Sequence, residues 1–241
     1  MQIEQTSISP FWPIAKWTMV ALTAVSVLAN IFFYFANSYE WLTVRSVYYI
    51  LDSLLFLAAT VLMFFFAPAR MMRFAGAAFA IGNILFVILG YVGNYMDSYI
   101  TTVLRGIAAL VMLSGFAAIY TCSGRYDIGR SVKFATCAYY FSYFIGLAYS
   151  FPIINHTGNF MSELVGINMS ASNFIAVLIY KIAVCIMWYS IARHMNGPEI
   201  NEDTEASDRK LKRLVSVMGS LVAFSMIFVF IMAYINEEFY H

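Results

Sequence analysis

The chain has 241 residues, of which 62% are hydrophobic and only 11% are charged, and its formal net charge at pH 7 is +1. A soluble domain usually carries about 25% charged residues, so this composition excludes a water-soluble globular protein. The 22 Phe, 17 Tyr and 4 Trp residues are typical of a bundle of membrane helices with aromatic side chains at both interfaces. We therefore predict an all-α integral membrane protein that forms a single domain over residues 1–241.

Seven apolar segments are long enough to cross a bilayer, which takes about 20 residues of α-helix. They cover approximately residues 14–35, 47–67, 74–95, 100–121, 134–154, 172–192 and 214–235. These runs are too long for the strands of a closed barrel and show no alternation of apolar and polar residues. The first segment is too long for the core of a signal peptide and lacks a clear cleavage site, so we expect it to remain as a membrane helix.

Basic residues gather on one side of this seven-helix arrangement. That side carries Lys16, Arg70, Arg73, Arg125, Arg130, Lys133, Arg193, Arg209, Lys210, Lys212 and Arg213. The opposite side has Arg45, with Arg105 slightly inside the fourth segment. The positive-inside rule then predicts a cytoplasmic N-terminus, an external C-terminus and a multi-pass protein of the cell membrane.

Two connections are long enough to have roles of their own. Residues 155–171 form an external loop in this topology, and residues 195–213 form a cytoplasmic loop. Gly197 and Pro198 end the sixth helix. After them, acidic residues precede basic ones, which is the order of charges that stabilises both ends of a short helix through its dipole. This loop is either a solvated linker or a docking site for a cytoplasmic protein partner.

The two halves of the chain share some local features. The first segment opens with AKWTMVAL and the fifth with VKFATCAY, while RMMRF precedes the third and KLKRL the seventh. Segments one to three and five to seven would share an orientation, which suggests a parallel 3+1+3 repeat, a design found among transporters. Any protein of alternating helices, however, places basic residues before every second one. The layout is similar to that of the SWEET sugar carriers and of the vitamin carriers of the nicotinamide riboside class, without their substrate motifs.

Three ionisable side chains fall inside the apolar segments. Lys181 lies about 14 Å below the outer end of the sixth segment, which is too deep for its side chain to reach the interface. An unpaired charge there costs roughly 2.5–3.5 kcal/mol on insertion scales. Asp52 and Arg105 lie nearer the outer ends of their segments, and Lys181 leans towards their level. We therefore predict a buried cluster of Asp52, Arg105 and Lys181.

This cluster has two interpretations, a functional one and a structural one. Ionisable residues inside a membrane mark pathways for ions or substrates, whereas a buried pair can simply fix the register of two helices. Arg105 could also pair with Asp97 at the outer interface.

Two helix faces of small and polar residues also have two interpretations. They either pack closely against a neighbouring helix or line a cavity. One face is Thr23, Ser26 and Asn30, and the other is Gly76, Ala80, Asn83, Val87, Gly90 and Asn94. If these faces line an aqueous cavity, Asn30 and Asn83 join Asp52, Arg105 and Lys181 as candidates for the pathway.

The sequence lacks the motifs of common membrane enzymes. The three histidines are too scattered to bind haem or a metal, and there is no H-E-x-x-H, G-x-S-x-G or Walker motif. Lys181 is not in the last helix, where retinal proteins carry their lysine. We expect no cofactor, no metal and no nucleic-acid partner. The pattern favours a transporter of a small polar or anionic solute, with a non-catalytic membrane subunit or scaffold as the alternative and a lipid-acting enzyme as a more distant one.

Overall fold

A computed structural model describes residues 9–37, 42–92, 98–122, 128–149 and 169–195, together with separate helical positions between 209 and 231. Six helices have defined bounds: α1 Trp12–Asn37, α2 Leu42–Phe66, α3 Arg70–Val92, α4 Ser98–Cys122, α5 Gly129–Tyr149 and α7 Met169–His194. Within the described ranges the ordered elements are all helices, so the all-α prediction is confirmed. Most of the predicted loops 155–171 and 195–213 lies outside the described residues.

Among the described residues, four stretches of helix are long and apolar enough to cross a membrane. They are Trp12–Tyr34 in α1, Arg70–Leu89 in α3, Ile100–Thr121 in α4 and Asn173–His194 in α7, and α2 carries a shorter apolar stretch, Ile50–Phe66. Large apolar side chains also lie on the outside of the molecule, where Leu28, Phe32 and Phe65 are 66%, 72% and 62% exposed. A surface of this kind is suited to contact with lipid.

All six helices start earlier than their apolar windows, α2 and α5 by the most. α2 begins at Leu42 rather than near residue 47, and α5 begins at Gly129 rather than near residue 134. The helical hydrogen-bond pattern does not depend on hydropathy, so a helix continues through polar residues at the membrane interface. The windows followed hydropathy alone and therefore missed these first turns.

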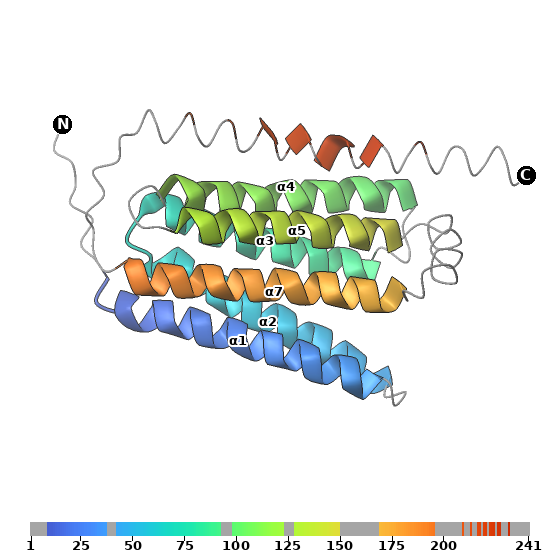
Figure 1. Cartoon of the computed structure of the whole chain (residues 1–241), viewed down its shortest axis with the longest axis horizontal. Helices are drawn as coiled ribbons and strands as arrows, with labels where there is room; N and C mark the ends of the chain where they lie inside the picture. The colour runs from blue at the N-terminus through green and yellow to red at the C-terminus, as the bar shows by residue number, and fades with distance from the viewer. Residues whose placement is uncertain are drawn as a thin grey trace, which may run out of the picture.

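The six helices form a closed ring. Consecutive helices from α1 to α5 pack against each other, α5 packs against α7, and α7 returns to α1 (Figure 1). The described positions between 209 and 231 lie along α4 (Figure 1), where Met226 contacts Gly106 and Gly219 faces Leu110. Gly106 and Leu110 are on the opposite face of α4 from Met112, which points to the centre of the ring. These described positions therefore pack outside the ring.

Helices α2 and α3 approach each other closely at Gly76. A Cβ atom at this position would lie 2.6 Å from the backbone N of Phe64 and 2.8 Å from the backbone O of Thr60. Small residues allow such contact between membrane helices. At Gly76, the small-residue face predicted for residues 76–94 thus serves close packing; Asn94 and the surroundings of Gly90 are not described.

A second junction joins the start of α1 to the end of α7. Trp12 Nε1 donates a hydrogen bond to the backbone O of Met195 at 3.2 Å, and Lys16 Nζ donates to the same atom at 3.4 Å. All three residues are buried. The carbonyls at the end of a helix lack partners within the helix and carry partial negative charge, so an indole and an ammonium group stabilise this end of α7.

The Gly76 contact generates a stability prediction. We expect Gly76→Ala to lower the free energy of unfolding in detergent by about 1–3 kcal/mol, because the added methyl group meets backbone that cannot turn aside. Gly146→Ala on α5 is the matched control, since a Cβ there meets no atom within 4 Å. Equal thermal stability of the two variants would contradict the close approach of α2 and α3.

Candidate functional site

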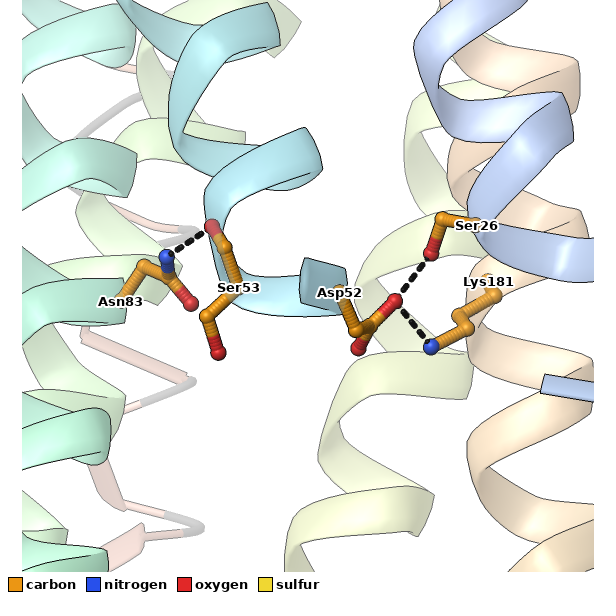
Figure 2. Close-up of polar contacts among 5 residues, drawn as sticks. All are labelled: Ser26, Asp52, Ser53, Asn83 and Lys181. Atoms are coloured by element: carbon orange, nitrogen blue, oxygen red, sulfur yellow. Dashed lines mark hydrogen bonds and ion pairs between the residues drawn. The ribbon is translucent and has the colours of Figure 1, made fainter. Parts of the chain in front are cut away.

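An ion pair lies in the middle of the helix ring. Lys181 Nζ on α7 donates to Asp52 Oδ1 on α2 at 2.5 Å, and their side chains are 10% and 22% exposed (Figure 2). The predicted contact between these two residues is therefore present. It explains how α7 accommodates an ammonium group near its midpoint, because the charge is neutralised by a carboxylate on the facing helix.

A third helix contributes to the same carboxylate. Ser26 on α1 donates a hydrogen bond to Asp52 Oδ1, so one oxygen atom accepts from both neighbours, and Oδ2 is turned away from them (Figure 2). Hydrogen bonds to an ionised acceptor are stronger than those between neutral groups. Asp52 thereby connects α1, α2 and α7.

The pair borders a cavity of about 170 Å³ at the centre of the ring. All six helices contribute to its lining: Thr23, Ser26, Asp52, Phe56, Asn83, Phe86, Met112, Tyr139, Tyr180, Lys181 and Val184. A water molecule takes about 30 Å³ in the liquid, so several would fit. Pockets for drug-sized ligands measure about 300–1,000 Å³, so this cavity suits only a small solute.

The five residues predicted for the pathway take different positions. Asp52, Lys181 and Asn83 line the cavity, and Asn83 Nδ2 donates to the backbone O of Ser53 on α2 at 3.0 Å (Figure 2). Asn30 is buried on α1 one turn beyond Ser26, outside the cavity lining. Arg105 is half-buried on α4, where it interacts electrostatically with Tyr143 of α5, and it too is outside the lining. The role of all five in a pathway stays a prediction.

Aromatic residues of the cavity were missed by the sequence analysis. Phe56, Phe86, Tyr139 and Tyr180 line it, and the rings of Tyr139 and Tyr180 lie 5.3 Å apart between centroids. A signal was available, because tyrosines of membrane helices usually lie at the interfaces. Tyr139 and Tyr180 instead fall near the middle of α5 and α7. The prediction from sequence considered only charged and amide side chains and therefore did not include these two tyrosines.

Comparisons with known proteins leave the site to be interpreted from its own chemistry. Searches against protein-family models, curated proteins and solved structures find no match for this chain. Within the part of the chain that the structure describes, no group of three or more His, Cys, Asp or Glu side chains could hold a metal ion. The function of the protein is therefore inferred from the cavity and its ion pair.

The ion pair generates a prediction for a double-mutant cycle. We expect Asp52→Asn to lower the free energy of unfolding by about 3–5 kcal/mol, because it leaves the Lys181 ammonium buried without a counter-charge. Adding Lys181→Met should recover much of this loss, since both charges are then gone. Unfolding would be followed in detergent micelles.

The control for this cycle is Lys133→Met, which removes an exposed ammonium group from α5. It should not rescue Asp52→Asn. Strictly additive effects of Asp52→Asn and Lys181→Met would mean that the two side chains are not coupled.

Proposed function

We propose that the protein is a multi-pass transporter of the cell membrane that carries a small polar solute. The observation that supports this proposal best is the Asp52–Lys181 pair at the edge of a cavity, inside a ring of helices suited to span a bilayer. A pair that served only to fix helix register would need no cavity beside it. Charged groups that face a cavity at membrane depth are typical of solute and ion pathways.

The membrane arrangement belongs to the same proposal. Seven spans cross the bilayer, with the seventh at residues 214–235, where the described positions are helical and pack against α4. The N-terminus is cytoplasmic and the C-terminus external, in keeping with the distribution of Lys and Arg. The parallel 3+1+3 repeat remains a prediction within this arrangement.

The ion pair links solute binding to proton movement. A solute that donates hydrogen bonds to Asp52 competes with Lys181 for the same carboxylate. Once displaced from Asp52, the Lys181 ammonium is in a low-dielectric site, where the charged form is disfavoured and the proton is released. Release of that proton on one side of the membrane and its recovery on the other would couple the solute to a proton gradient.

The junction of Trp12 and Lys16 with Met195 gives this transporter a closed end. It joins α1 and α7 on the side assigned to the cytoplasm, and its groups are buried. Alternating access to a central site requires one end of the helix ring to open while the other stays closed. Opening towards the cytoplasm would separate α1 from α7 at these hydrogen bonds.

The proposal predicts a transport phenotype for Lys181. Purified protein in proteoliposomes with a pH gradient is given a mixture of small polar solutes, and uptake is measured by mass spectrometry. We expect the wild type to accumulate at least one solute and Lys181→Met to accumulate none while still inserting and purifying. Lys181→Arg should also fail, because a guanidinium group does not release its proton in a protein.

Lys133→Met, which removes an exposed lysine of α5, should transport as the wild type does. Full uptake by Lys181→Met would contradict the functional role of the pair. If the wild type takes up nothing and instead copurifies with a stoichiometric protein held by residues 195–213, the chain is a membrane subunit rather than a carrier.

A further inference from the structure

The neutral polar side chains of the cavity lining direct their hydrogens at the protein itself. Thr23 donates its hydroxyl hydrogen to a backbone carbonyl of its own helix at 2.9 Å, and Ser26 donates its own to Asp52 Oδ1. Asn83 Nδ2 donates to the backbone O of Ser53 at 3.0 Å. A hydroxyl group whose hydrogen is used in this way has only lone pairs left for another molecule. The polar part of the lining therefore offers mainly acceptors to a solute.

Two of these acceptor atoms have no hydrogen-bond partner within the described part of the chain. They are Asp52 Oδ2, which is turned away from Ser26 and Lys181, and Asn83 Oδ1 (Figure 2). Neither oxygen is among the polar atoms that are buried without a partner, and both residues line the cavity. A solute with N–H groups can therefore reach Asp52 Oδ2 while Lys181 still occupies Oδ1.

Net charge decides which kind of donor suits this site. The charged side chains of the lining are Asp52 and Lys181, which balance each other. When a solute displaces Lys181 and the ammonium group releases its proton, the carboxylate keeps its negative charge. A neutral solute would leave that charge unbalanced in a low-dielectric site, which is strongly unfavourable, whereas a solute with one positive charge restores neutrality. An anion would be repelled by the carboxylate.

The rest of the cavity suits an organic cation better than a metal ion. Four of the lining residues are aromatic and come from four different helices: Phe56, Phe86, Tyr139 and Tyr180. Aromatic rings attract organic cations through the negative potential of their faces. The volume of about 170 Å³ is several times the roughly 30 Å³ that one water molecule takes in the liquid. A small molecule fills this space, and a bare metal ion does not.

We propose that the cavity binds a small organic cation with N–H groups, of the guanidinium or primary ammonium kind, in exchange for the proton of Lys181. This inference rests on the proposed transport function, and it specifies the class of solute and the stoichiometry of the exchange. The cation replaces Lys181 at the Asp52 carboxylate. An N–H bond of the Lys181 ammonium group then breaks, its proton passes to water, and the lysine remains as a neutral amine.

The charge of the site is the same before and after this exchange. One positive group faces Asp52 in each state, the ammonium group of Lys181 in the first and the organic cation in the second. The other titratable groups of the lining are the hydroxyls of Tyr139 on α5 and Tyr180 on α7. Tyrosine ionises at about pH 10 in water, so both keep their protons at neutral pH. Lys181 is therefore the proton donor in the exchange.

Three planar probes of nearly equal size test the charge requirement: guanidinium, urea and acetate, which are cationic, neutral and anionic, respectively. Each is added to the full chain in lipid nanodiscs, in a weakly buffered solution that contains a pH indicator. We expect guanidinium to bind at least about tenfold more tightly than urea or acetate and to release about one proton per protein molecule at saturation. Because binding releases a proton, the apparent affinity should rise about tenfold for each unit of increase in pH.

Lys181→Met tests the competition for the carboxylate. This variant lacks the competing ammonium group, so guanidinium should bind it at least about threefold more tightly than it binds the wild type at pH 8.5. Guanidinium should also raise the melting temperature of the variant, because it restores a counter-charge to Asp52. Lys133→Met, which removes an exposed ammonium group from α5, is the matched control and should bind guanidinium and release a proton as the wild type does.

Four results would overturn the inference. They are equal binding of urea or acetate, guanidinium binding to the wild type without proton release, no guanidinium binding at tens of millimolar, and equal proton release by sodium chloride. Uptake of another solute that depends on Lys181, without proton release by guanidinium, would remove this inference and leave the transport proposal standing. Proton release by guanidinium without its flux into proteoliposomes would support the binding site and remove the transport proposal.

Discussion

A charge inside a lipid bilayer must be paired, hydrated or neutralised, and the Asp52–Lys181 contact meets this requirement for two helices at once. Lys181 lies near the midpoint of α7 and Asp52 near that of α2, so neither side chain is at a helix end that would meet the aqueous interface. Each charge lowers the free-energy cost of burying the other. Ser26 adds a donor from α1, and the three helices are therefore held at one level by a single carboxylate oxygen.

This contact also accounts for the shape of the ring. Residues 52 and 181 are far apart in the chain, and their contact requires α7 to return beside α1 and α2 after α3, α4 and α5 have passed around the far side. Gly76 brings α3 close to α2, and the Trp12 and Lys16 contacts with Met195 join α1 to α7 at one end. Large apolar side chains such as Phe79, Phe116 and Trp188 fill much of the interior, and the central space that remains beside the ion pair is the cavity.

The sequence predicted this ion pair because charged residues are rare in apolar segments and therefore conspicuous. It did not predict where Asp52 falls along its helix. The apolar window suggested a helix that starts near residue 47, whereas α2 starts at Leu42 and places Asp52 near its middle. Arg105 shows the limit of reasoning from depth alone: it lies outside the cavity lining, because the rotation of each helix, which packing sets, decides which of its side chains face the centre.

The cavity could not be predicted from any local pattern. Its eleven lining residues come from six helices, and each helix supplies only one to three of them. Tyr139 and Tyr180 resemble ordinary aromatic residues of a membrane helix until the ring places them beside Asp52 and Lys181. Predictions of helices depend on neighbouring residues, which the sequence displays, whereas a central site depends on how all the helices are rotated around their axes.

The transport proposal requires the cavity beside the ion pair to be an aqueous compartment on a path across the membrane. Its most direct test is the reactivity of a cysteine at Asn83 towards a charged, membrane-impermeant methanethiosulfonate reagent added to one side of the membrane or the other. Asn83→Cys would be introduced into a chain without Cys122, Cys137 and Cys185, and Leu28→Cys, on the outer face of α1, would serve as the control. We predict that Asn83→Cys reacts from at least one side and that an added solute slows the reaction, while Leu28→Cys reacts from neither side. An Asn83→Cys variant that folds normally but is as unreactive as Leu28→Cys from both sides would show a sealed structural pair instead of a path.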